Sequence, residues 1–154
     1  RTAMMQAAEK GHADVVGLLI AGGADLEAGD KEGATGLIIA AGQGHADVVA
    51  TLLAKGANPD AKDDQGATAL IWAVGEGRTD VMELLLAAGA NPNIQDADGV
   101  TALMEAVNTQ HNELIGPLMS YRADRDLRDG TGRTAMDIAK QKGNDEAAAL
   151  LAGP

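Results

Sequence analysis

Three histidines are the side chains in this sequence best suited to general acid–base chemistry or metal binding. His12, His45 and His111 lie 33 or 66 residues apart, and each precedes a short segment that is rich in apolar residues. A nucleophilic mechanism needs a nucleophile beside the base, and no such residue recurs at this spacing. The pattern therefore predicts a structural role, in which each histidine forms hydrogen bonds at the start of a helix.

Carboxylates gathered at turns are the second candidate for chemistry. Segment 96–99 (Asp-Ala-Asp-Gly) and Glu105 have part of the spacing of a calcium loop, but Ile94 would occupy the first ligand position. Asp63 and Asp64 are neighbours at a turn, where neither burial nor a fixed charge is expected to tune them for catalysis. The sequence thus predicts a non-enzymatic protein without metal or cofactor.

A threonine that returns every 33 residues organises the whole chain. It occurs at Thr2, Thr35, Thr68, Thr101 and Thr134, each time followed by a small residue and then by Leu or Met. A strict period of this length is typical of a solenoid, in which each unit buries its apolar face only by stacking on its neighbours.

Each unit predicts two short helices and an extended arm. In the second unit, Thr35 caps a helix over residues 36–43, which Gly44 ends. His45 opens a second helix, which runs to Gly56. Turn-forming residues over 57–66 predict an arm with a tight, hairpin-like turn. Such short helices are marginal alone, so their stability must come from stacking.

The columns of threonine, glycine and aspartate resemble the ankyrin repeat, whose consensus runs roughly Gly-x-Thr-Pro-Leu-His-x-Ala-Ala-x-x-Gly-His-x-x-Val-Val-x-Leu-Leu. The resemblance covers the whole chain and implies an all-α solenoid of stacked helix-turn-helix units with hairpin-like turns. The Pro and His of the consensus are replaced, as in Thr68-Ala69-Leu70-Ile71. This variant is similar to bacterial ankyrin sequences.

One domain over residues 1–154 is expected, with repeats at about 1–33, 34–66, 67–99, 100–132 and 133–154. The first repeat starts abruptly at its capping threonine, so we expect it to be truncated upstream. The last repeat has no arm after its second helix, as in a C-terminal cap.

Composition limits the partners. The chain has 23 acids against 12 bases, a net charge of −11 and no cysteine. An acidic surface disfavours binding to nucleic acid and is compatible with a basic protein surface. No apolar run approaches the roughly 18–20 residues of a membrane span, so no membrane insertion is expected. The compartment stays open between cytoplasm and periplasm, and we expect a monomer.

The charge is unevenly distributed. Residues 60–119 contain 10 acids and two bases, whereas half of all the bases follow this segment. Such a division would orient a dipolar partner, with its basic side over repeats three and four. The alternative is ordinary solubilising charge.

The fourth repeat departs from the pattern. Gln110 and Arg122 stand where other repeats have a helix-ending glycine. Pro117 lies mid-way through the predicted second helix, where it would remove a hydrogen bond to the carbonyl of Glu113 at a cost of about 3 kcal/mol. The irregularity is either a kink that the flanking repeats tolerate or a distortion that reshapes the binding surface.

The resemblance implies that the arm tips and the exposed side of the first helices form one concave face that binds a partner. These columns vary between repeats, while the glycine, leucine and alanine columns hardly do, so the fold does not dictate them. The predicted partner-binding residues are Lys31, Glu32, Gln43, Asp64, Gln65, Ala67, Trp72, Glu76, Ala97, Asp98, Val100, Asn108 and Thr109.

Trp72 is the only tryptophan, and it lies one helical turn before Glu76. Large aromatics at partly exposed sites are frequent interface hot spots, but a lone tryptophan also serves as structural filler. Both interpretations remain open at this stage. Tyr121 is a weaker candidate for an anchor.

The leading hypothesis is a protein-protein interaction module that acts as an inhibitor, an adaptor or an immunity-type protein. One alternative is a structural or spacer segment of a larger multidomain protein. Another is an engineered or reconstructed repeat protein, although irregularities such as Pro117 argue against a pure consensus design.

Overall fold

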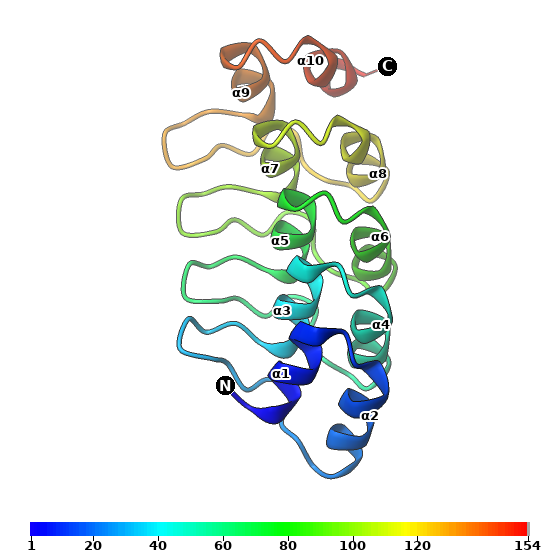
Figure 1. The fold of residues 1–154 in the computed structure, drawn as a ribbon. Helices are drawn as coiled ribbons and strands as arrows, with labels where there is room; N and C mark the ends of the chain where they lie inside the picture. The colour runs from blue at the N-terminus through cyan, green and yellow to red at the C-terminus, as the bar shows by residue number, and fades with distance from the viewer. Residues whose placement is uncertain (154) are drawn as a thin grey trace.

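Two columns of short helices form the body of the molecule, which a computed structural model describes over residues 1–153 (Figure 1). One column holds the first helix of each repeat and the other holds the second. The first column comprises α1 (Ala3–Lys10), α3 (Gly36–Gln43), α5 (Ala69–Gly75), α7 (Ala102–Asn108) and α9 (Ala135–Gln141). The second comprises α2 (Ala13–Ala21), α4 (Ala46–Ala54), α6 (Thr79–Ala87), η1 (Asn112–Leu114) with α8 (Ile115–Ser120), and α10 (Asp145–Ala152).

The repeating threonines cap the first helices as predicted. Thr35 Oγ1 accepts the N–H of Ile38 at 3.3 Å, and Thr68 Oγ1 accepts that of Ile71 at 3.3 Å. The same bond forms at the start of α1, α7 and α9. Because one side-chain oxygen satisfies an otherwise orphan N–H, each cap fixes where its helix begins.

The core runs between the two helix columns along the whole stack. Leu37, Leu70 and Leu103 from the first helices are each 1% exposed, and Leu52 and Leu85 from the second helices are fully buried. Consecutive first helices pack on one another, as do α2, α4 and α6 in the second column and α8 with α10. This stacking supplies the burial that an isolated repeat lacks.

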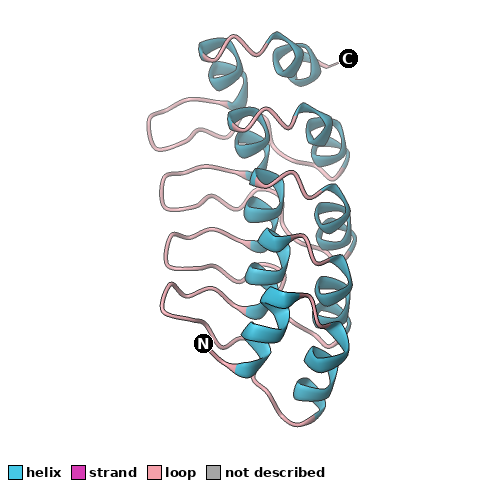
Figure 2. Cartoon of the chain, in the orientation of Figure 1, coloured by secondary structure: helices cyan, strands magenta, loops and turns pink. Residues whose placement is uncertain are grey.

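Extended arms project from the first-helix side, and Figure 2 shows them as loops. In the arm between α4 and α5, the N–H of Asp63 donates to the carbonyl of Ala67 at 3.0 Å, and Lys62 forms an isolated antiparallel bridge with Thr68. The described residues 1–153 thus contain hairpin-like turns but no named strand. The all-α prediction is confirmed.

The second helix of repeat four is not the interrupted helix that Pro117 predicts. The segment begins as the 3-10 helix η1, and α8 starts at Ile115, so Pro117 is only the third residue of an α-helix. The N–H groups of a first turn have no intrahelical acceptor, so proline removes no hydrogen bond there. The expected penalty of about 3 kcal/mol therefore does not apply.

The outer face of α2 differs from the faces between repeats. Val15 is 40% exposed and Leu18 is 73% exposed, whereas the equivalent Val48 and Val81 are fully buried by the preceding repeat. Val15 and Leu18 of α2 therefore lie in solvent, while Val16 on the opposite side is buried in the core. None of the helices described over residues 1–153 is both long and apolar enough to cross a membrane.

Candidate functional site

A single aspartate shapes the turn at each arm tip. Asp63 Oδ1 accepts the N–H groups of Gln65 and Ala67, both at 2.9 Å. Asp30, Asp96 and Asp129 accept the equivalent pair of N–H groups in their own arms. These carboxylates therefore form turns, as the sequence predicts.

Main-chain hydrogen bonds join each arm tip to the next. The N–H of Asp64 donates to the carbonyl of Glu32 at 2.9 Å, and that of Ala97 donates to Gln65 at 2.8 Å. The arm after α8 bonds to the preceding arm in the same way. The tips form one connected row, from which exposed residues project: Lys31, Glu32, Asp64, Gln65, Ala97 and Asp98.

Ala67 and Val100 do not lie at the surface as the predicted binding role requires. Ala67 is only 5% exposed, and Val100 is partly buried against the hydrophobic core. Each follows the glycine of its arm and donates its N–H to the turn aspartate, so the chain has already turned back toward the first helices. A partner could not reach the Ala67 side chain, and we remove it from the candidate surface.

The first helices present a second row of predicted residues. Gln43, Trp72, Glu76 and Thr109 are exposed, while Asn108 is partly buried. Trp72 and Glu76 lie one turn apart at the end of α5, so they share one face of that helix.

A groove of about 560 Å³ lies between the two rows in repeats one to three. It brings together seven of the predicted residues: Lys31, Glu32, Gln43, Asp64, Gln65, Trp72 and Glu76. A smaller hollow of about 260 Å³ contains Thr109 and shares Trp72 with the groove. Ala97, Asp98, Val100 and Asn108 line neither space.

Trp72 stands between the groove and the hollow. Its side chain is held by a hydrogen bond from Nε1 to Asp63 Oδ2 at 2.8 Å, while the residue remains 39% exposed. The indole is therefore both oriented by the fold and accessible to a partner. An oriented aromatic loses little conformational entropy when a partner binds.

Two residues that the sequence did not identify also line the groove. Arg1 forms ion pairs with Glu9 at 2.6 Å and with Asp30 at 3.5 Å. Arg78 Nε donates to the carbonyl of Gly42 at 3.3 Å. The only signal in the sequence is that Arg78 replaces a histidine in its column.

The histidine column connects successive repeats. His45 Nε2 donates to the carbonyl of Glu9, 2.9 Å away, just as Arg78 reaches back to the preceding repeat. His111 Nδ1 lies 2.9 Å from Thr109 Oγ1. Asn144, at the same position in the last repeat, exchanges two amide hydrogen bonds with Asn112. The predicted structural role at the start of the second helices is confirmed for His45 by its hydrogen bond.

Two carboxylates near the groove have shifted pKa values, in opposite directions. Burial alone would raise the pKa of Asp30, but the N–H groups of Ala34 and Glu32, together with Arg1, lower it. Burial raises the pKa of Glu105, which lies at the edge of the smaller hollow. Asp30 is thus a stabilised structural anion, whereas Glu105 is an anion that the fold stabilises poorly.

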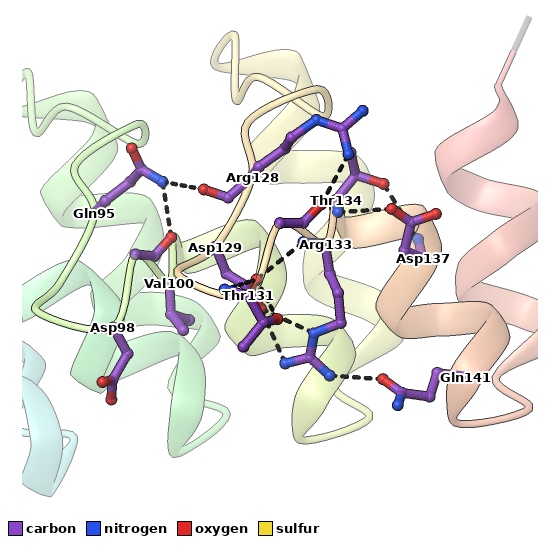
Figure 3. A network of polar contacts seen from close by, with 12 residues as sticks. Gln95, Asp98, Val100, Arg128, Asp129, Thr131, Arg133, Thr134, Asp137 and Gln141 are labelled. Atoms are coloured by element: carbon purple, nitrogen blue, oxygen red, sulfur yellow. Dashed lines mark hydrogen bonds and ion pairs between the residues drawn. The ribbon is translucent and has the colours of Figure 1, made fainter.

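The last arm is held by the densest set of polar contacts (Figure 3). Arg133 donates from Nε to Asp129 Oδ2 at 3.0 Å and from a terminal nitrogen to Gln141 at 2.6 Å. The Arg133 N–H and the Thr131 hydroxyl hold the pKa of Asp129 well below its usual range. Arg133 therefore stabilises this arm instead of projecting toward a partner.

The first aspartate of the segment that partly resembles a calcium loop is engaged in its own turn. Asp96 Oδ1 already accepts two N–H groups of its own turn. Over residues 1–153, no three His, Cys, Asp or Glu side chains lie close enough together to hold a metal ion.

Stacked helix pairs, capped by threonine and joined by a row of hydrogen-bonded arms, define a solenoid repeat protein with a groove along one face. The family model for ankyrin repeats (3 copies) matches residues 4–96 and 84–154, and the chain belongs to this family. Ankyrin repeats generally mediate protein–protein interactions and are generally non-catalytic. A comparison with curated proteins finds no significant match.

Proposed function

We propose that the chain is a non-catalytic module that binds another protein through the groove between its arm tips and first helices. The observation that carries the proposal is the position of Trp72, which is oriented by Asp63 yet 39% exposed where the groove meets the smaller hollow. Aromatic side chains that a partner can bury are the most frequent interface hot spots. This favours the interpretation of Trp72 as an anchor.

The charge of the groove favours a basic partner. Its lining includes six acids and three bases, and Arg1 is already paired with Glu9 and Asp30. Complementary charge would accelerate association and select against acidic partners. An inhibitor, an adaptor or an immunity-type protein would each use such a groove, by occluding, recruiting or positioning the partner.

A pull-down with two matched variants tests the proposal. The groove variant combines Trp72→Ala, Glu76→Lys and Asp64→Lys, all at exposed residues that line the groove. The control variant combines Tyr121→Ala, Glu83→Lys and Glu113→Lys, which make the same kinds of change on exposed residues of the second-helix column. Both variants change the net charge equally, so a general electrostatic effect would affect both alike.

We expect the groove variant to lose partners that wild type and the control variant both retain. Circular dichroism spectra of the variants would verify that each is folded. Equal recovery by all three proteins, or loss confined to the control variant, would contradict the proposal. Loss confined to the control variant would place binding at the second-helix column, beside Tyr121.

A further inference from the structure

The smaller hollow of about 260 Å³ extends the groove toward repeat four. Gln65, Trp72 and Glu76 line both spaces, so a partner that fills the groove passes directly over the hollow. Its remaining walls come from the third arm and from α7, through Asp96 and Glu105.

The lining of this hollow combines an apolar surface with negative charge. Ala67, Ile71 and Gly75 form its apolar part, and the carboxylates come from Glu76, Asp96 and Glu105, which no basic residue in the described lining offsets. One oxygen of Asp96 is committed to its turn. Asn108 bonds to the Glu105 carboxylate, and the charges of His111 and Lys142 act on it. Among the described residues neither Glu76 nor Glu105 forms an ion pair, so both can still face a cation beside the Trp72 ring.

Gly75 makes room for the Glu105 carboxylate. A Cβ at position 75 would lie 3.2 Å from Glu105 Oε1 and 3.4 Å from its Cγ. Gly75 is the last residue of α5 and does not have a positive φ, so alanine would suit the helix better. What the glycine provides is therefore space. Burial of Glu105 also raises its pKa, which a bound cation would reverse.

We propose that the hollow receives one arginine side chain of the partner, with its guanidinium stacked on Trp72 and bound by Glu105 and Glu76. The inference rests on the proposed function, since it names what the partner places in the groove. Arginine fits better than lysine because a planar guanidinium can stack on an indole face and also form paired hydrogen bonds with a carboxylate. The methylene groups of its side chain can pack against the exposed part of the Trp72 ring.

A peptide titration tests this without a known partner. The probes are Ac-Gly-Arg-Gly-amide, its lysine counterpart and its citrulline counterpart, which keeps the shape of arginine but lacks the charge. The readout is the indole N–H resonance of Trp72, which is a single NMR signal because the chain has one tryptophan. We expect saturable shifts with a roughly millimolar Kd for the arginine peptide, weaker binding of lysine and none of citrulline.

Two variants and a control locate the site. Glu105→Gln should weaken the arginine peptide about tenfold, because a charge-assisted contact becomes a neutral one. Gly75→Ala should weaken it as well by filling the hollow. Glu83→Gln, at an exposed residue of α6 outside the groove and the hollow, should leave it unchanged. Glu105→Gln should leave the melting temperature at pH 7 unchanged or raised, so that its effect on binding is not a loss of fold.

Equal shifts for arginine and citrulline, or equal arginine affinity in wild type and Glu105→Gln, would overturn the inference. So would a groove-dependent partner that binds unchanged after all its arginines are replaced by glutamine. These outcomes leave the proposed function intact. That function fails instead when the pull-down recovers no partner that depends on the groove.

Discussion

The orientation of Trp72 depends on one carboxylate oxygen of Asp63. In Asp63→Asn the side-chain oxygen can still accept the turn N–H groups, but an amide NH₂ then faces the indole N–H, and two donors cannot bond. We expect more acrylamide quenching of Trp72 fluorescence and a loss of up to about 1 kcal/mol in the free energy of unfolding.

Asp64→Asn is the matched control for that prediction. Asp64 is the next residue along the same turn, and its side chain is exposed. Quenching should remain at the wild-type level in this variant. If Asp63→Asn and Asp64→Asn give the same quenching, the hydrogen bond does not hold the indole.

Arg122 and Gln110 adopt left-handed backbone conformations, with φ of 67° and 61°. For an L-residue this conformation costs about 1–2 kcal/mol. Glycine avoids this cost but loses more backbone entropy on folding, so the net gain in stability is smaller. Arg122→Gly should therefore raise the free energy of unfolding by about 0.5–1 kcal/mol in urea titrations.

The reverse substitution one repeat earlier is the control. Gly89 has the equivalent position, a φ of 91° and open space around its Cα, so Gly89→Arg should destabilise by a similar amount without a steric clash. A destabilised Arg122→Gly would show that the arginine side chain contributes more than its backbone conformation costs.

The repeating columns of the sequence predict the local contacts well, because these contacts form within one repeat. Thr68 capping α5 and Asp63 shaping its turn involve partners three or four residues away. Contacts between repeats are harder to infer. The pairing of Gly75 with Glu105 joins positions 30 residues apart, and each residue alone resembles ordinary variation in its column.

At the scale of an element, η1 and α8 show how the fold accommodates Pro117. Because Pro117 lies in the first turn of α8, Pro117→Ala should change the free energy of unfolding by less than about 1 kcal/mol. Thr51 occupies the equivalent position inside α4, an uninterrupted α-helix. Thr51→Pro should therefore cost about 3 kcal/mol.

Urea titrations of both variants measure this contrast. A large increase in the free energy of unfolding from Pro117→Ala would mean that the proline strains α8 and that the late start of the α-helix, after η1, does not relieve the strain. Equal, small effects of both substitutions would contradict the dependence on helix position.

Inter-repeat hydrogen bonds explain why neighbouring repeats keep their register. His45 and Arg78 each reach the carbonyl of a residue in the last turn of a first helix in the preceding repeat. The tips themselves are joined by main-chain bonds. Repeats two and three are thus each bonded to the preceding repeat at two separate places.

On the scale of the whole molecule, the charge distribution and the groove coincide only in part. The acidic segment 60–119 supplies Asp63, Asp64 and Glu76 to the groove, but it also supplies Asp80 and Glu83 to the second-helix column. Charge alone therefore does not distinguish the two faces. Trp72 distinguishes the two faces, because its indole is held by Asp63 and exposed at the groove. The proposed binding face therefore rests on the position of this side chain and not on the net charge of −11.

The arm aspartates connect the stability of the molecule to pH. The pKa of Asp30 and that of Asp129 are lower in the folded protein than the unfolded value of about 3.9, chiefly because backbone N–H groups bond to the ionised carboxylates. Such groups contribute their full stabilisation above the unfolded pKa and lose it as the pH falls toward the folded pKa. We therefore expect the melting temperature to decrease as the pH is lowered below about 4.

Asp129→Asn tests this link at the arm where the contacts are densest. The variant should melt well below wild type at pH 7, and the difference should narrow below about pH 4, because wild type then progressively loses the stabilisation that asparagine never had. Asp98→Asn, with an exposed side chain at the tip of the preceding arm, should melt like wild type throughout. Melting curves followed by circular dichroism between about pH 2.5 and 7 give the comparison. A difference that stays constant across this range would mean that Asp129 acts through its shape and hydrogen-bonding pattern, not through its ionisation.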